Sequence, residues 1–185
     1  MPRSEAYHPS AKSWLNLTRL SGWFRQVSPG VIPVLIVLLA LAARLAPGAR
    51  TIDDAYITFR YARNILSAAG FVYNAGERVL GTTTPLYTLL LSGTGVFFGG
   101  KDANFPQIAF GINTLADCGV CLLLYFCGKR LGFALAGTGA SLAWAVAPYS
   151  VTFAIGGLET SVYVLLLTAA AFCLSAEKTL LAAFL

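Results

Sequence analysis

The stretch PQIAFGINTLADCGVCLLLYFC, Pro106 to Cys127, decides the fold, because it is long and almost entirely apolar. A transmembrane α-helix needs about 20 consecutive, predominantly apolar residues, and this run is long enough. It contains one charged residue, Asp117, which shares a helix face with Asn113 one turn earlier. A carboxylate inside a membrane helix is costly. It indicates either a functional group or a protonated side chain bonded to Asn113 that serves helix packing.

The composition points to the same class of protein. Of the 185 residues, 57% are hydrophobic and only 11% are charged, which excludes an ordinary soluble domain. The net charge of +5 bears on membrane orientation and anionic lipid, and gives no indication of nucleic acid. All four cysteines lie in apolar runs, where a free thiol packs as a small hydrophobe. They are Cys118, Cys121, Cys127 and Cys173.

Further apolar runs lie on both sides of this stretch, and together they predict an all-α, polytopic transmembrane protein. Residues 1–28 are polar and basic and suit a cytoplasmic N-terminus, whereas residues 29–185 form the transmembrane module. The final residues begin another apolar run, which predicts that the chain is a truncated N-terminal portion. The other expected membrane segments are Val31–Ala46, Pro85–Phe98, Leu131–Ala147 and Ser161–Ala176.

The segment Pro85–Phe98 is short for a span and is typical of a re-entrant or interfacial helix. If it enters the membrane and returns, Lys129, Arg130 and Lys178 join the basic N-terminus on the cytoplasmic side. The positive-inside rule favours that arrangement. External loop 1 then comprises residues 47–105 and external loop 2 comprises residues 148–160, both on the extracytoplasmic side.

Loop 1 contains TIDDAYITFRYARNILSAAG, Thr51–Gly70, which predicts a juxtamembrane amphipathic helix closed by Gly70. At 100° per residue, Arg60 and Asn64 fall within about 20° of Asp53, while the opposite face is largely apolar. Such a helix suits the membrane surface or the side of neighbouring spans.

The adjacent acids Asp53 and Asp54 have two interpretations. Structurally, Thr51 is the N-cap and Asp54 completes an acidic capping box, with both carboxylates favoured by the helix dipole. Functionally, a carboxylate near the bilayer surface acts as general base toward an acceptor hydroxyl, and Arg60 holds a phosphate. The residues alone do not separate the two.

The string DDAYITFRYARNILSAAGFVYNAGERVLGTTTPLYTLLL, Asp53–Leu91, resembles the first external loop of integral-membrane glycosyltransferases with the C-type (GT-C) fold. These enzymes take sugars from polyprenyl-phosphate carriers, and the closest likeness is to bacterial mannosyl- and arabinofuranosyltransferases. GGLET, Gly156–Thr160, resembles a motif after the third span of that group. The resemblance covers about Val31–Ala176, the N-terminal part of a typical member.

The resemblance implies transfer of a sugar, with inversion, to an acceptor hydroxyl on the extracytoplasmic face of the plasma (inner) membrane. Asp53 and Asp54 match the catalytic position, and Asp53 is favoured because it shares a face with Arg60. Glu159 matches an acid that helps to bind a metal or the acceptor; alternatively, the helix dipole stabilises it at a helix start. The expected substrate-binding residues are Tyr56, Arg60, Arg63 and Glu159.

The implied partners are a polyprenyl-phosphate-linked sugar donor, a glycan, lipid or protein acceptor, and membrane lipids, with no nucleic acid. The cofactor is not identified, although a divalent cation could bind with the help of Glu159. The alternative is a non-catalytic membrane protein, either a truncated remnant or an assembly partner. A transporter is disfavoured because no span is broken symmetrically.

Overall fold

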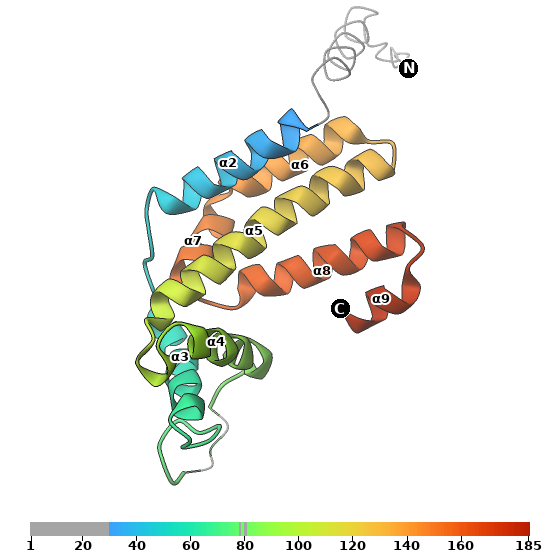
Figure 1. The fold of residues 1–185 in the computed structure, drawn as a ribbon. Helices are drawn as coiled ribbons and strands as arrows, with labels where there is room; N and C mark the ends of the chain where they lie inside the picture. Colours follow the sequence, from blue (N-terminus) through green and yellow to red (C-terminus); the bar gives the residue numbers. More distant parts are fainter. Residues whose placement is uncertain (1–29, 78, 80) are drawn as a thin grey trace, which may run out of the picture. The chain divides into compact units, whose positions relative to one another are not determined.

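The computed structural model describes residues 30–77, 79 and 81–185, so the cytoplasmic N-terminus expected at residues 1–28 lies outside the described residues. The chain divides into two compact units, Met1–Leu35 and Ile36–Leu185, and the candidate sites described below lie in the second. The described residues form helices and no strand (Figure 1), which confirms the expected all-α class for this part of the chain.

The membrane segments expected from hydropathy form helices close to their expected bounds. α5 has 26 residues, about 39 Å at 1.5 Å per residue, which exceeds the roughly 30 Å hydrocarbon core of a bilayer. Within the described residues, it alone is long and apolar enough to cross by itself, and α6 with α7 qualifies only as a pair bent by 50°. One candidate span is therefore shown. The elements are α2 (Val31–Leu45), α3 (Asp53–Leu66), α4 (Pro85–Phe97), η1 (Gly100–Asp102), α5 (Phe105–Arg130), α6 (Ala134–Val146), α7 (Pro148–Gly156), α8 (Thr160–Ser175) and α9 (Thr179–Phe184).

α5 is the central helix of the second unit, and both α6 and α8 pack along it (Figure 1). The crossing with α6 is close because two glycines face each other. A Cβ atom added to Gly137 would lie 2.7 Å from Cα of Gly128, so the two backbones are in contact. Small residues at such crossings allow apolar helices to pack through their backbones.

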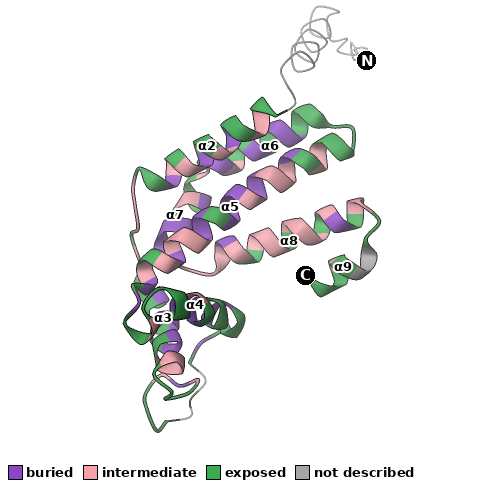
Figure 2. Cartoon of the chain, viewed as in Figure 1, coloured by how far each residue is buried: buried purple, intermediate pink, exposed green. Residues whose placement is uncertain are grey.

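α3 and α4 pack against the beginning of α5 around a core of aromatic and aliphatic side chains. Phe59 stacks on Phe105 with ring centroids 6.3 Å apart, and Leu91 is fully buried in the same cluster. The other side of α4 is apolar and exposed (Figure 2); the side chain of Phe97, for example, is 84% exposed. That exposed face is suited to contact with lipid, as expected of an interfacial or re-entrant helix.

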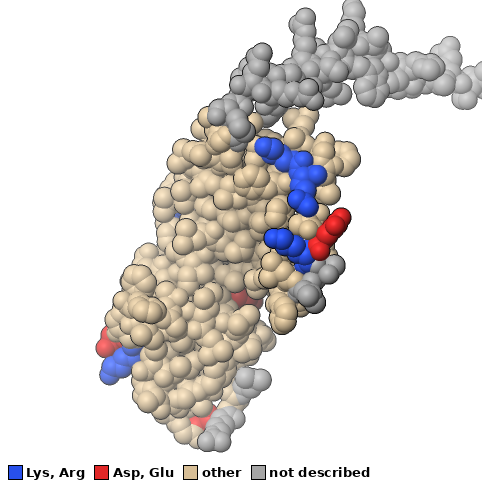
Figure 3. Space-filling view, turned by 45° about the vertical axis from the view of Figure 1, so that its right-hand side comes forward, with Lys and Arg blue, Asp and Glu red and all other residues tan. Residues whose placement is uncertain are grey.

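Among the described residues, charged side chains are sparse on the face that Figure 3 shows. Figure 3 shows a face on which lysines, arginines and acids form small groups separated by wide uncharged areas. This distribution fits the low charge content of the sequence and a protein that contacts an apolar medium over part of its surface.

Three expected boundaries differ in the structure. The N-cap of α3 is Ile52 and makes no side-chain cap bond, so the capping box predicted from Thr51 is wrong. The helix ends at Leu66 rather than Gly70, because the chain turns at Ala68, which has a left-handed φ of 61°. The expected loop at residues 148–160 begins with α7, a helix with Pro148 in its first turn.

Candidate functional site

The two acidic motifs meet through the backbone just before α3. The amide of Arg50 donates to the carbonyl of Ile155 at 2.9 Å, and the amide of Ile52 donates to the carbonyl of Gly156 at 3.0 Å. The chain that leads into the Asp53–Asp54 pair is therefore fixed against the end of α7, where the GGLET motif begins.

Both glycines of GGLET allow this close contact. A Cβ atom on Gly156 would lie 2.7 Å from the Ile52 side chain. Gly157 has a φ of +83°, and a Cβ atom there would lie 3.1 Å from the ring of Phe59. The left-handed conformation is one that other L-residues adopt at a cost. The glycine pair thus has a packing role that explains its presence independently of any catalytic role.

A buried polar network, formed by Tyr87 of α4 and Asn113 of α5, supports the GGLET motif. The Tyr87 hydroxyl donates to Asn113 Oδ1 at 3.2 Å and lies 3.3 Å from the Gly157 carbonyl, its second acceptor. Asn113 Nδ2 donates to the carbonyl of Leu158 at 2.7 Å. The phenol is a hydrogen-bond donor in this buried network.

Sequence reasoning missed Tyr87, although a signal was present. A tyrosine within the apolar run Pro85–Phe98 must find a partner for its hydroxyl if it is buried. The polar residues of the opposing helices, Asn113 among them, were the candidates.

Asp53 and Asp54 form the first turn of α3, and both side chains are exposed. Within the described part of the chain, no side-chain hydrogen bond or ion pair engages either carboxylate. Two accessible carboxylates therefore lie on a backbone that α7 holds in place, and their catalytic role stays a prediction.

Arg60 is engaged with the loop that follows α3. Its Nε donates to the carbonyl of Tyr73 at 2.9 Å, and its Nη2 donates to Asn74 Oδ1, also at 2.9 Å. Its guanidinium carbon lies 4.4 Å from the centroid of the Tyr73 ring. Because a guanidinium has five N–H donors, other N–H groups remain that can contact a phosphate.

Arg63 and Tyr56 are the other expected substrate contacts on α3. Arg63 Nε donates to the carbonyl of Lys101 at 3.1 Å, and its guanidinium lies 5.6 Å from the centroid of the Phe105 ring. Tyr56 is exposed and contacts Phe59 edge-on, with ring centroids 5.5 Å apart. Arg60 and Arg63 thus both connect α3 to neighbouring loops.

Glu159 immediately precedes α8 and is half-buried, without a side-chain capping bond. The dipole interpretation of this residue is therefore compatible with its position. Among the described residues, no group of three or more histidine, cysteine or acidic side chains could hold a metal ion.

The second buried polar network is centred on Arg44 and Asp117, and sequence reasoning missed its arginine. Arg44 Nε donates to Asp117 Oδ2 at 2.8 Å, and neither side chain is exposed. Trp144 donates to the same carboxylate at 3.3 Å. The prediction that Asn113 is the partner of Asp117 is wrong, because Asn113 bonds instead to Tyr87 and the chain after α7.

Arg44 also connects the ends of other helices. It donates to the carbonyl of Ala145 at 2.9 Å and to Ser150 Oγ at 3.2 Å, so one guanidinium contacts α5, α6 and α7. The bend between α6 and α7 lies between these two partners. Arg44 therefore fixes the end of α2, from which the chain continues to α3.

Comparisons with known proteins found one partial similarity. The chain is 32% identical over 114 residues to a terminal β-(1→2)-arabinofuranosyltransferase from Mycobacterium tuberculosis (strain ATCC 25618 / H37Rv). The alignment covers 58% of this chain and 18% of that protein, so the chain spans less than a fifth of the length of its relative. No protein-family model and no solved structure matches the chain. Over part of its length, the chain is similar to a glycosyltransferase.

Proposed function

We propose that the protein transfers a sugar from a polyprenyl-phosphate donor to an acceptor hydroxyl, on the extracytoplasmic face of a plasma (inner) membrane that its helices cross several times. The contact between the start of α3 and the end of α7 carries this proposal, because it joins the two acidic motifs of external loops 1 and 2. The similarity to an arabinofuranosyltransferase and the candidate span α5 also support it.

In this proposal, Asp53 or Asp54 is the general base. The carboxylate accepts the proton of the acceptor hydroxyl while the hydroxyl oxygen bonds to the anomeric carbon of the sugar. The bond from that carbon to the phosphate oxygen breaks at the same time, and polyprenyl phosphate leaves with the electron pair. The products are the glycosylated acceptor, with inverted configuration, and the carrier phosphate.

Two further features of loop 1 suit a lipid-linked donor. The exposed apolar face of α4 contacts lipid, which keeps the loop at the depth of a carrier head group. Arg60 and Arg63 retain N–H donors beyond those that hold the loops, and these contact the leaving phosphate. Glu159 contributes to acceptor binding from the second loop.

The proposal is tested with the complete membrane protein in vesicles, supplied with polyprenyl-phosphate donors that carry arabinofuranose or mannose. Asp53→Asn and Asp54→Asn are compared with the wild type, and Asp102→Asn in η1 is the matched control because that acid is also exposed. Loss of the general base should lower kcat by about 100-fold or more, and the control should retain full activity.

Unchanged turnover in both variants would contradict the catalytic proposal. The alternative, a non-catalytic membrane protein such as an assembly partner or a truncated remnant, would then account for the chain.

A further inference from the structure

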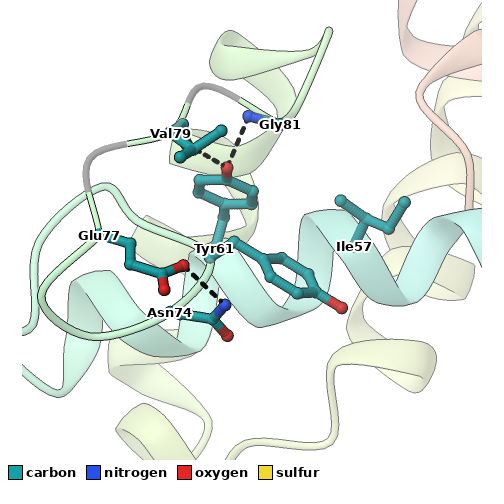
Figure 4. Close-up of a pocket in the computed structure, with 7 residues that line it drawn as sticks. Ile57, Tyr61, Asn74, Glu77, Val79 and Gly81 are labelled. Carbon is teal, nitrogen blue, oxygen red and sulfur yellow. Dashed lines mark hydrogen bonds between the residues drawn. The ribbon is translucent and has the colours of Figure 1, made fainter.

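A cavity of about 310 Å³ opens beside α3 (Figure 4). Ile57 and Tyr61 of α3 form one side, and the loop after α3 forms the other with Tyr73, Asn74, Glu77 and Val79. Its volume is at the lower end of the range for small-molecule sites.

The loop side of the cavity is held in place by hydrogen bonds to α3. The Tyr61 hydroxyl donates to the carbonyl of Val79 at 2.7 Å and accepts from the amide of Gly81 at 2.7 Å, and both bonds are drawn in Figure 4. Asn64 Nδ2 donates to the carbonyl of Tyr73 at 2.9 Å. A cavity built in this way needs little ordering when a ligand binds.

Arg60 fixes the polar side chains of the cavity. It donates to Asn74 Oδ1, and Asn74 Nδ2 in turn donates to Glu77 Oε2 at 3.0 Å. The amide and the carboxylate are thereby oriented relative to each other.

The walls combine two kinds of surface. Tyr73 presents an aromatic ring, and Ile57 and Val79 present exposed aliphatic side chains. Glu77 and Asn74 present a carboxylate and an amide next to these apolar groups. A sugar has the complementary pattern, because its C–H face packs on apolar and aromatic groups while its hydroxyls hydrogen-bond to carboxylates and amides.

We propose that this cavity binds a saccharide unit of the acceptor, an inference that rests on the proposed glycosyltransferase function. The geometry of α3 then selects one of the two acids. Tyr61 follows Asp54 by seven residues, so the two lie within about 20° of each other on the helix and about 10 Å apart along it. Ile57 lies between them, one turn after Asp54.

A saccharide bound at Tyr73 and Glu77 therefore extends along α3 toward Asp54. Asp53 instead shares the face of Arg60, whose remaining N–H donors are proposed to contact the donor phosphate. The acceptor hydroxyl that reacts is the one that reaches Asp54, which makes Asp54 the general base.

The test measures kinetics of the complete membrane protein in vesicles for Tyr73→Ala and Glu77→Gln. Each should raise KM for the acceptor by about tenfold while kcat at saturating acceptor and KM for the donor stay unchanged. Tyr73→Phe keeps the ring and should restore the acceptor KM. Tyr149→Ala is the matched control, because Tyr149 is 79% exposed and lies outside the cavity. An unchanged acceptor KM in both cavity variants would overturn the inference.

A second measurement keeps the cavity testable apart from catalysis. Methyl arabinofuranoside and methyl mannopyranoside are added to the protein in lipid nanodiscs, and saturation transfer from protein to sugar is recorded by NMR. Saturation transfer to either glycoside that falls in Tyr73→Ala but not in Tyr149→Ala supports the inference. Absence of transfer to both glycosides in the wild type overturns it. Retained turnover in Asp53→Asn and Asp54→Asn would instead show that the proposed function fails.

Discussion

Replacing Arg44 with methionine should destabilise the protein more than any replacement of an exposed arginine. Arg44 and Asp117 are both fully buried and 2.8 Å apart, and Arg44 makes further hydrogen bonds to Ala40, Ala145 and Ser150. Methionine fills most of the same volume but provides no donor. Arg44→Met therefore leaves the Asp117 carboxylate hydrogen-bonded to the indole of Trp144 but without its buried positive partner.

The expected magnitudes follow from the number of groups left unpaired. Removing one member of a buried ion pair costs about 3–5 kcal/mol, because the other charge stays buried without compensation. The double variant Arg44→Met/Asp117→Leu removes both charges and leaves the Ala145 carbonyl without this donor. An unsatisfied buried acceptor costs about 1–3 kcal/mol. The double variant should therefore be more stable than either single variant.

The free energy of unfolding is measured in mixed micelles by titration with a denaturing detergent, followed by circular dichroism. Arg130→Met is the control, since Arg130 is exposed and its change should cost less than about 1 kcal/mol. Two results would refute the reasoning. One is a loss for Arg44→Met no larger than that of the control. The other is a double variant whose loss equals the sum of the two single losses, because that would show no coupling between the two side chains.

Three further predictions concern the packing around the two motifs. Gly157→Ala should lower the free energy of unfolding by about 1–2 kcal/mol because Gly157 has a φ of +83°, and denaturant titration measures this change. Gly137→Ala should cost about 1–3 kcal/mol, measured in the same way, because the new Cβ would meet the backbone of Gly128 at 2.7 Å. Tyr87→Phe should cost about 1–3 kcal/mol, because it leaves the buried Oδ1 of Asn113 without the phenol donor. The exposed control Tyr149→Phe should change the free energy of unfolding by less than about 0.5 kcal/mol in the same titration.

The helices were largely predictable from the sequence because apolar periodicity reports which segments avoid water. α2, α4, α5, α6 and α8 lie close to the runs that hydropathy indicated. α7 was expected to be a loop, since its sequence PYSVTFAIG contains several polar residues. Its signals were nevertheless present, with proline in the first turn and a left-handed glycine directly after the helix.

The candidate site was predictable only where its residues are neighbours in sequence. The apolar face expected for α3 is the buried one in the structure, with Ala55, Phe59 and Ala62 among its buried residues. The partner of Asp117 was not predictable, because Arg44 is 73 residues away and resembles the positive flank of an apolar span. The cavity beside α3 was missed for the same reason. It depends on how Tyr61 holds residues 79 and 81.

The positions of these buried polar groups explain how two exposed acids in the first turn of α3 can be held rigidly. A carboxylate that acts as a base must remain accessible to its substrate, so its own side chain cannot be fixed by burial. Here the backbone that carries Asp53 and Asp54 is fixed instead, by the pairing of residues 50 and 52 with α7. Tyr87 and Asn113 support that pairing, because they bond to the carbonyls of Gly157 and Leu158 just after α7. The Arg44 network anchors the end of α2, the helix that precedes α3. Buried polar bonds are strong in apolar surroundings. The backbone of the proposed site can therefore be preorganised while its two acids stay accessible. Substitutions in either network should impair the proposed sugar transfer, although the residues of these networks do not contact the substrate.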